Sequence, residues 1–253
     1  MKIINLLYVI PGRAEPSDKA EMITQLLFGE SLELLEEQEK WCKVKNLEDD
    51  YECWVDKKQL TFVEDEEFEV WNSVNKSYNC VPQFTLLSNR GSIHLSYGAW
   101  VPDSQAINIG DWRISIKSTI QCKADNWSSY VITWINTPYL WGGKTLMGVD
   151  CSGFVQQCFA YLGVYLPRDA WQQQQKGELI GNASSWKKGD LAFFESNGKV
   201  THVGIIWEDQ KIIHASGRVR IDLLSEEGIR DLNDINNLTH KLHSVKRVYE
   251  FEH

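Results

Sequence analysis

Hydrophobic and polar positions change their pattern along the chain, and the first part carries only short apolar runs of strand length. These runs are Asn5–Ile10, Met22–Phe28, Ser31–Glu36, Trp41–Val44 and Tyr51–Val55. Turn residues such as Gly29-Glu30 and Asp49-Asp50 separate them, and no stretch between them has the helical period. Closely spaced strands without helices are typical of small barrels and sandwiches. The pattern therefore predicts a small all-β domain over residues 1–60.

A fainter version of the same pattern follows over residues 61–125. Its short apolar runs are Phe84–Leu87, Ile93–Leu95, Ala99–Val101 and Ala106–Ile109. Glycine and proline stand between these runs, as they do at turns. We predict a second small β-barrel here, joined to the first by the acidic run Glu64–Glu67, which we interpret as a solvated linker.

From residue 126 to 253 the order changes to helices followed by strands. Helical periodicity covers Trp127–Ile135, Phe154–Leu162 and Arg168–Gln175. Strand patterns cover Asp190–Glu195, His202–Trp207, Lys211–His214, Val219–Leu224 and Val245–Phe251. Helices first and an antiparallel sheet afterwards indicate an α+β domain. The expected fold is thus two small all-β barrels followed by an α+β domain.

Cys151 stands where the second of these helices begins. Asp150 before it is a good N-cap, and Gly163 is a good C-terminal stop. The unpaired N–H groups and the dipole at a helix start lower a cysteine pKa and can hold an oxyanion. The alternative is a buried structural cysteine, which is the more common role. The polar neighbours Asp150, Ser152 and Gly153 favour a nucleophile.

Two histidines can supply the base that such a nucleophile needs. His202 begins one apolar strand and His214 ends the next, with Glu208-Asp209-Gln210 as the turn between them. A hairpin places the start of one strand beside the end of the other. Each histidine alone is more often an ordinary hydrogen-bonded residue. Together behind Cys151 they fit a base whose tautomer is held by a second imidazole.

Composition excludes some partners. The 253-residue chain has a formal net charge of −9 and a pI near 5.2, which argues against binding nucleic acid or an anionic membrane surface. Its six cysteines form no C-x-x-C pair, and with six scattered histidines a metal site is not expected. The cysteines fit disulfides and free thiols equally well.

The apolar start Ile3–Ile10 is too short for a membrane span or a signal sequence and is interpreted as a strand. No obligatory protein partner is indicated. The cytoplasm is the expected compartment, or the periplasm or cell exterior if a leader has been removed from the sequence.

Several motifs of residues 126–225 resemble the NlpC-type family of papain-like bacterial cell-wall cysteine peptidases. They are, in order, Tyr139-x-Trp141-Gly142-Gly143, Asp150-Cys151-Ser152-Gly153, Leu166-Pro167-Arg168, Gly189-Asp190-Leu191-x-Phe193-Phe194, His202-Val203-Gly204-Ile205 and Ile213-His214-Ala215. The resemblance implies a papain-like fold for residues 126–253 and a peptidase without metal or organic cofactor. It assigns Cys151 as nucleophile, His202 as base and His214 as the residue that orients the base. Tyr139 and the amide of Cys151 would hold the oxyanion, although Tyr139 can also be simple aromatic packing.

The first domain adds a second resemblance. Gly29–Leu35, Trp41 and Asp50–Val55 resemble bacterial SH3-like domains. SH3-like modules ahead of such a peptidase are similar to the γ-D-glutamyl-L-diamino acid endopeptidases. This implies cleavage of short peptidoglycan peptides with a free N-terminal L-Ala, in murein peptide recycling.

The residues implied at the substrate amine are Asp150, Ser152, Glu21 and Tyr51. Each has a plainer alternative, since Asp150 can be only a helix cap and the others surface or barrel residues. Ala170 departs from these endopeptidases, which often carry serine there, so the fine specificity stays open. The alternative function is a wall-anchored hydrolase of intact stem peptides, and a non-catalytic wall-binding module is the third possibility.

Overall fold

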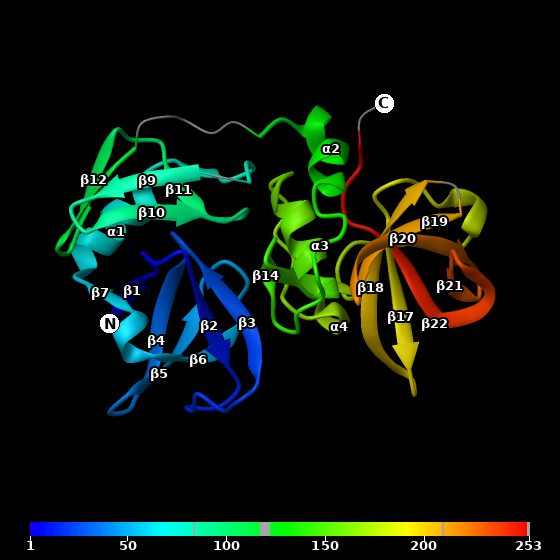
Figure 1. Cartoon of the computed structure of the whole chain (residues 1–253), viewed down its shortest axis with the longest axis horizontal. Coiled ribbons are helices and arrows are strands. Elements are labelled where there is room, and N and C mark those ends of the chain that lie inside the picture. Colours follow the sequence, from blue (N-terminus) through cyan, green and yellow to red (C-terminus); the bar gives the residue numbers. More distant parts are fainter. Residues whose placement is uncertain (83, 117–121, 209, 252–253) are drawn as a thin grey trace. The chain divides into compact units, whose positions relative to one another are not determined.

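The computed structural model describes residues 1–82, 84–116, 122–208 and 210–251. The chain divides into two compact units (Figure 1). The N-terminal unit holds Met1–Ser128 and Trp141–Leu146, and the C-terminal unit holds Ser129–Leu140 and Met147–His253. Among the described residues, no helix is both long enough and apolar enough to span a membrane.

The first part of the N-terminal unit is an antiparallel sheet of seven strands in the order β3-β2-β6-β5-β4-β1-β7. The strands are β1 (Lys2–Ile4), β2 (Val9–Arg13), β3 (Met22–Leu27), β4 (Ser31–Glu37), β5 (Trp41–Asn46), β6 (Glu52–Asp56) and β7 (Thr61–Val63), with a short 3₁₀ helix η1 (Lys57–Gln59) before the last. Alternate residues such as Cys42 and Val44 are fully buried in its core, as the period of two requires. The expected all-β fold of the first domain is confirmed, and its sheet extends to Val63, past the predicted boundary at residue 60.

One predicted strand of this domain is wrong. The apolar run Asn5–Ile10 is not one strand, because the chain turns between β1 and β2. Asn5 causes the turn: its buried side chain accepts a hydrogen bond from the Leu7 amide at 3.0 Å and donates one to the Leu26 carbonyl at 2.9 Å. A side chain that bonds its own backbone two residues on favours a turn over a continuous strand.

The acidic run after this sheet is also not a linker. Glu64 is the N-cap of helix α1 (Asp65–Ser73), and it forms a capping box with Glu67. Acidic side chains in the first turn of a helix are stabilised by the helix dipole, so the same residues that suggest a solvated stretch begin a helix here. Phe68 and Trp71 bury the inner face of α1.

The rest of this unit forms two further small sheets. Strands β8 (Lys76–Tyr78) and β11 (Trp100–Pro102) form a pair, and β10-β9-β13-β12 form an antiparallel sheet. The bounds of the second sheet are Phe84–Ser88 (β9), Gly91–Leu95 (β10), Ala106–Ile109 (β12) and Trp112–Ser115 (β13). Apolar residues of these strands share a core with α1, with Ile4 of the first sheet, and with Leu6 and Phe28, which lie between its strands. The strands of this region are divided between two sheets. The second SH3-like barrel expected over residues 61–125 is therefore not confirmed and stays a prediction.

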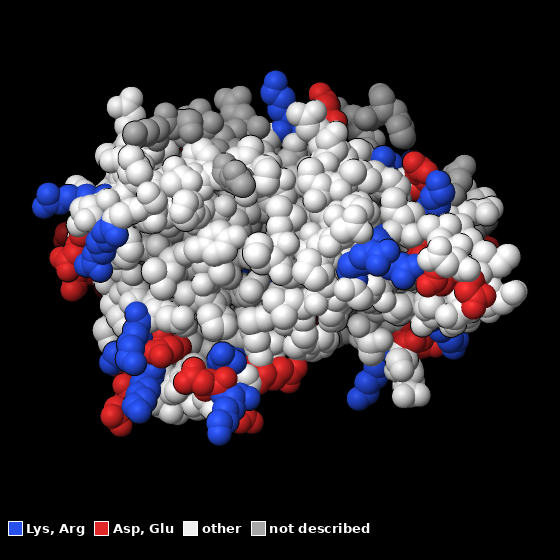
Figure 2. All heavy atoms as spheres, viewed as in Figure 1, with Lys and Arg blue, Asp and Glu red and all other residues white. Residues whose placement is uncertain are grey.

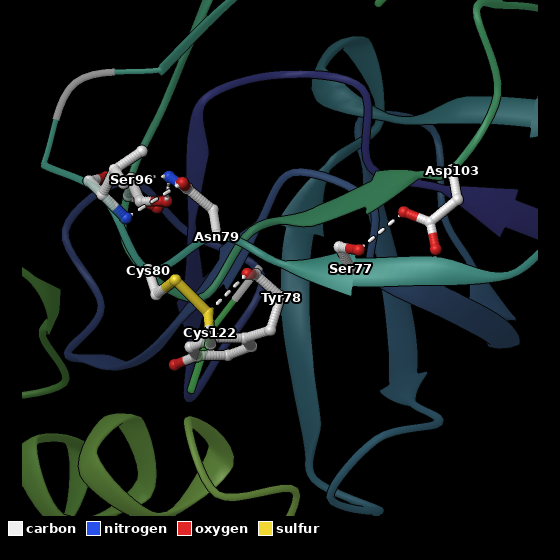
Figure 3. Close-up of a disulfide and its surroundings, with 8 residues drawn as sticks. Ser77, Tyr78, Asn79, Cys80, Ser96, Asp103 and Cys122 are labelled. Carbon is white, nitrogen blue, oxygen red and sulfur yellow. Dashed lines mark hydrogen bonds between the residues drawn. A yellow bond between two sulfur atoms is a disulfide. The ribbon is translucent and has the colours of Figure 1, made fainter. Parts of the chain in front are cut away.

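A disulfide joins Cys80, after β8, to Cys122, across 42 residues of sequence (Figure 3). Beside it, the buried amide of Asn79 donates to the Ser96 carbonyl at 2.6 Å. The other four cysteines, Cys42, Cys53, Cys151 and Cys158, form no disulfide and are buried. The sequence left disulfides and free thiols open, and the structure contains both.

Charged residues show no gathering of one sign on the face of the molecule in Figure 2, where Lys and Arg lie beside Asp and Glu. On the first sheet, Lys43 pairs with Glu52 at 2.6 Å, Lys45 with Asp50 at 2.6 Å, and Lys57 with Glu37. Exposed pairs of this kind contribute little to stability.

The segment Trp141–Leu146 belongs to the N-terminal unit although it lies far along the sequence. Gly142 has a φ of +77°, and a Cβ on it would lie 2.6 Å from the Met22 carbonyl oxygen. Only glycine fits such a close backbone approach. The Lys144 amide donates to Gln25, and its ammonium pairs with the buried Glu30 at 2.9 Å. The Trp-Gly-Gly motif thus lets this segment, with β14 (Lys144–Thr145), pack against the first sheet.

The C-terminal unit contains helices and a large antiparallel sheet. The helices are α2 (Trp127–Ile132), whose first two residues lie in the N-terminal unit, α3 (Cys151–Ala160) and α4 (Ala170–Gln173), with the short 3₁₀ helix η3 (Ala183–Ser185). The 3₁₀ helix η2 (Ala124–Asn126), directly before α2, belongs to the N-terminal unit. The strands are β15 (Gly148–Val149), β16 (Glu178–Leu179), β17 (Leu191–Ser196), β18 (Lys199–Glu208), β19 (Lys211–Ser216), β20 (Arg218–Ser225), β21 (Gly228–Asp231) and β22 (Asp234–Arg247).

This sheet closes on itself. Its order is β16-β22-β17-β18-β19-β20-β21, and β22 also pairs with β21, so β17 to β22 form a barrel. The expected α+β arrangement is confirmed, although α4 is shorter than expected and the last strand ends at Arg247 instead of Phe251. Residues Cys151 to Phe159 of α3 are all buried. The helices form a second layer beside the sheet, and α3 is the central helix of that layer.

Candidate active site

Cys151 is the first residue of α3, as the sequence predicts. Asp150 caps the helix: its side chain accepts a hydrogen bond from the Gly153 amide at 2.7 Å. The Cys151 Sγ accepts hydrogen bonds from the amides of Ser152 and Val203. The Val203 amide belongs to β18 and follows His202 directly, so the thiol lies beside the backbone of the predicted base.

The protonation state of this thiol differs from the expectation. Burial, and then the nearby Asp150 carboxylate, raise the pKa of Cys151 to about 12, and the amides of Val203 and Ser152 and the charge of Arg168 only moderate the rise. The expected lowering by the helix start does not prevail, because the thiol is 5% exposed and desolvation penalises a thiolate. The resting group is therefore a thiol that needs a base.

His202 and His214 are brought together as expected. Nε2 of His202 lies 2.8 Å from Nδ1 of His214, and both rings are buried. The register explains the contact: Gly204 of β18 is opposite His214 of β19, so the two histidines lie on the same face of the sheet, diagonally across the strand pair. Burial, followed by the neighbouring His214 and His240, lowers the pKa of His202 well below its usual value of 6.5. A neutral His202 can accept a proton at neutral pH.

Two residues near this pair were not predicted from the sequence to belong to the site. Asp222 of β20 lies behind His214, with Oδ2 3.0 Å from Nε2 of that ring. His240 of β22 stacks on His202 with ring centroids 4.3 Å apart. Asp222 is the second residue after Arg220, which is opposite His214 in the β19–β20 register. Without that register an acidic residue in an alternating strand gives no signal, and His240 lies in a strand that the sequence did not predict at this length.

Tyr139 is half-buried, and a β-bridge to Val149 and a hydrogen bond from its amide to the Gly217 carbonyl fix its backbone. Burial, and then the proximity of Cys151 and Asp150, raise the pKa of its phenol. A phenol that stays protonated beside the nucleophile is a hydrogen-bond donor. Its place is compatible with the predicted oxyanion role, which stays a prediction.

Asp150 and Ser152 form a buried network with Arg168. Arg168 donates to Asp150 Oδ1 at 3.0 Å and to Ser152 Oγ at 2.9 Å, and it is 1% exposed. The helix-cap role predicted for Asp150 is confirmed. The second predicted role, as receptor for a substrate amine, stays a prediction, and Arg168 already neutralises part of the Asp150 charge.

The remaining predicted substrate residues lie in the N-terminal unit or near α4. Glu21 is exposed directly before β3, and Tyr51 is half-buried directly before β6. Their contact with a substrate stays a prediction. Ala170 is the first residue of α4 and is 7% exposed, so a serine here would add a hydroxyl at a nearly buried position.

Among the described residues, His202, His214 and His240 form a group whose ligand atoms lie within 4.8 Å of one another. Three imidazoles are a common zinc-binding set. Here, however, the facing nitrogens of His202 and His214 are 2.8 Å apart and share a hydrogen bond, while the other nitrogen of His214 faces Asp222. A metal would have to displace that shared proton, so this geometry fits proton transfer better than coordination.

Comparisons with known proteins agree with this arrangement. Residues 136–233 match the NlpC/P60 family, and residues 12–60 match the bacterial dipeptidyl-peptidase SH3 domain. A probable endopeptidase NlpC homologue of Haemophilus influenzae is 43% identical over 84 residues, which cover 33% of this chain and 44% of that protein. A γ-D-glutamyl-L-lysine dipeptidyl-peptidase of Bacillus cereus is 27% identical over 227 residues, or 76% of this chain and 66% of that protein.

The chain thus spans about half to two thirds of the length of these relatives. Among solved structures, an NlpC/P60 family protein from Bacillus cereus superposes with a TM-score of 0.79 over 98% of this chain and 99% of that chain. At 21% identity this likeness shows the fold. Cys151, His202 and His214 all fall within the matched range 136–233, and the chain therefore carries an NlpC/P60 domain behind a bacterial dipeptidyl-peptidase SH3 domain.

Proposed function

We propose that this protein is a cysteine peptidase that cleaves the bond between γ-D-Glu and the following diamino acid in short peptidoglycan peptides with a free N-terminal L-Ala. One observation carries the proposal. In an NlpC/P60 domain, Cys151 begins a buried helix, its Sγ bonds to the amide that follows His202, and Nε2 of His202 lies 2.8 Å from His214.

The first step forms a thioester. Sγ of Cys151 attacks the γ-carbonyl carbon of D-Glu while His202 takes the thiol proton, since the thiol is protonated at rest. The carbonyl oxygen becomes an oxyanion, which accepts hydrogen bonds from the Cys151 amide at the helix start and from Tyr139. His202 then gives its proton to the leaving amine of the diamino acid, and the carbon–nitrogen bond breaks.

The second step restores the enzyme. His202, again neutral, takes a proton from water as the water oxygen attacks the thioester carbon. The carbon–sulfur bond breaks, the thiolate receives the proton from His202, and the L-Ala-γ-D-Glu dipeptide leaves as a free acid. His214 holds the imidazole of His202 in place throughout.

Recognition of the free amine is the finer part of the proposal. The Bacillus cereus relative is named a dipeptidyl-peptidase, and removal of a dipeptide from the amino end requires a group that recognises that end. Asp150 and Ser152 beside the nucleophile, together with Glu21 and Tyr51, are the groups that we assign to the ammonium. Carboxylates and hydroxyls are suitable partners for an ammonium donor.

The test uses L-Ala-γ-D-Glu-diaminopimelate, the same peptide N-acetylated, and intact peptidoglycan. We expect cleavage of the free peptide, at least a hundredfold slower cleavage of the acetylated one, and none in Cys151→Ala. Cys158→Ala, which changes a buried thiol of the same helix, should stay active. Equal rates on the two peptides would overturn amine recognition, and preferred cleavage of intact peptidoglycan would favour the wall-anchored alternative.

The cellular role is a separate proposal. A preference for short free-amine peptides suits murein peptide recycling in the cytoplasm. The Cys80–Cys122 disulfide supports the alternative compartment, the periplasm or the cell exterior, because disulfides persist in oxidising surroundings.

A further inference from the structure

Asp222 is a buried carboxylate that touches the second histidine of the site from behind. It lies on β20, is 3% exposed, and its Oδ2 is 3.0 Å from Nε2 of His214. Ile212 is opposite Asp222 and Gly204 is opposite His214 in the two registers. His202, His214 and Asp222 therefore lie in a diagonal row on one face of three neighbouring strands.

The surroundings of Asp222 hold it in the ionised form. Arg220 of the same strand donates to Oδ1 at 2.8 Å, and the Leu232 amide donates to the same oxygen at 3.2 Å. Burial by itself raises the pKa of Asp222, but the hydrogen bonds from His214 and Leu232 and the positive charge of Arg220 outweigh it and lower this pKa below its ordinary value. The other charged or titratable groups nearby are Asp231 of β21, which pairs with Arg220 at 3.0 Å, and His240 of β22.

An ionised carboxylate accepts hydrogen bonds and donates none. The contact between Asp222 and His214 therefore requires the proton of His214 on Nε2. In neutral His214 the other nitrogen, Nδ1, is then an acceptor, so Nε2 of His202 must donate to it across 2.8 Å. That places the proton of neutral His202 on Nε2 and leaves its Nδ1 as an acceptor.

We propose that Asp222 is a positioning residue that sets the tautomers of both histidines, so that Nδ1 of His202 is the nitrogen able to take the Cys151 proton. Nδ1 is the ring nitrogen nearer to the backbone, and the next backbone amide, that of Val203, bonds to the Cys151 Sγ. The same row stabilises His202 once it is charged, because its Nε2–H then faces an acceptor whose ring is bonded to a carboxylate. The mechanistic part of this inference depends on the proposed peptidase function, whereas the tautomers do not.

The substitution Asp222→Asn tests the inference because the neighbouring donors fix the orientation of the asparagine side-chain amide. Arg220 and the Leu232 amide both donate to the position of Oδ1, so the asparagine carbonyl takes that position. Its NH₂ group then faces Nε2 of His214, which has to become an acceptor. His214 carries its proton on Nδ1 and donates to Nε2 of His202, and the proton of His202 moves to Nδ1, where it blocks transfer from the thiol.

The expected result is a kcat/KM on the free peptide lower by up to ~10⁴-fold, the loss that a wrong histidine tautomer causes in a serine-protease triad. Histidine ¹⁵N spectra should show His202 and His214 protonated at Nε2 in the wild type and at Nδ1 in Asp222→Asn. The matched control is Asp231→Asn, which changes another carboxylate paired with Arg220 and should keep the wild-type tautomers and a kcat/KM within ~3-fold.

The two measurements separate failure of this inference from failure of the proposed function. Wild-type tautomers in Asp222→Asn, or an unchanged kcat/KM, would overturn the role of Asp222. If Asp222→Asn does not fold, the wild-type spectrum decides alone, since a proton on Nδ1 of His214 excludes the arrangement. A protein that cleaves no peptide yet shows the expected tautomers and their exchange in the variant would refute the peptidase proposal and support the role of Asp222 in setting the histidines.

Discussion

At the scale of single residues, the nucleophile and its base have pKa values that favour their neutral forms. Burial raises the pKa of Cys151 to about 12 and lowers that of His202 well below 6.5. A thiolate–imidazolium pair in the resting protein would require the opposite shifts. Cys151 is therefore deprotonated during attack, and the position of the proton on His202 decides whether that attack is possible.

This state predicts how Cys151 reacts with iodoacetamide. Because the thiolate fraction rises about tenfold per pH unit below the pKa, the alkylation rate should rise continuously from pH 6 to pH 9. Mass spectrometry of the Cys151 peptide measures the rate, and Cys151→Ala gives the background from Cys42, Cys53 and Cys158. A rate that is already constant below pH 7 would instead indicate a preformed thiolate–imidazolium pair.

At the scale of elements, the start of α3 depends on a buried ion pair. Arg168, ahead of α4, is 1% exposed and donates to Asp150 and Ser152 on either side of the nucleophile. Removing one partner of such a pair leaves an uncompensated buried charge, which costs about 3–5 kcal/mol. We expect Arg168→Met to lower the free energy of unfolding of the C-terminal unit by this amount in urea titrations.

The control for this prediction is an exposed pair in the same unit. Lys211 pairs with Glu208 at 2.8 Å, with both side chains largely in water, and Lys211→Met should cost less than about 1 kcal/mol. The double variant Asp150→Asn, Arg168→Met should recover part of the loss because no charge then remains unpaired. If Arg168→Met and Lys211→Met lowered the free energy of unfolding by equal amounts, the prediction would be contradicted.

Much of this arrangement can be predicted from local sequence, and its limits have a physical cause. The helix at Cys151 follows from a cap and a period of three and four, and the contact of His202 with His214 follows from one hairpin. Asp222 and His240 require the register of two further strand pairs, which depends on packing across the whole barrel. Glu64–Glu67 shows a second limit, because the same acidic composition suits a solvated loop and a helix start.

At the scale of the whole molecule, the buried histidines couple the stability of the C-terminal unit to pH. Burial, and then His214, lower the pKa of His240 to about 4, and that of His202 is also lowered. Between about pH 6.5 and 4 the unfolded chain therefore binds more protons than the folded one, so stability is full above 6.5 and is lost as the pH falls through this range.

Hydrogen exchange of the β17–β19 amides should show this decline already between pH 6.5 and pH 5, where exposed carboxylates scarcely titrate. His240→Gln removes one of the titrating groups and should make the decline shallower, whatever its effect on absolute stability. An equally steep decline in the variant would mean that other groups are responsible.

The Cys80–Cys122 bond predicts how the N-terminal unit responds to reduction. It closes a loop of 42 residues in sequence that contains strands β9 to β13 of the two small sheets. Cross-links of this kind restrict the unfolded chain and contribute ~2–4 kcal/mol. Dithiothreitol should therefore lower the free energy of unfolding of this unit by that amount, measured by urea titration.

The double variant Cys80→Ser, Cys122→Ser provides the control, because it should already have the lower stability and should not respond to dithiothreitol.

The same bond also bears on the compartment. A linked Cys80–Cys122 peptide in protein alkylated at the moment of cell lysis would favour an oxidising compartment, because a cytoplasmic thiol pool keeps such pairs reduced. Two alkylated cysteines at these positions would favour the cytoplasm, and the N-terminal unit would then have to be stable without its cross-link, held by the core that α1 shares with both sets of strands.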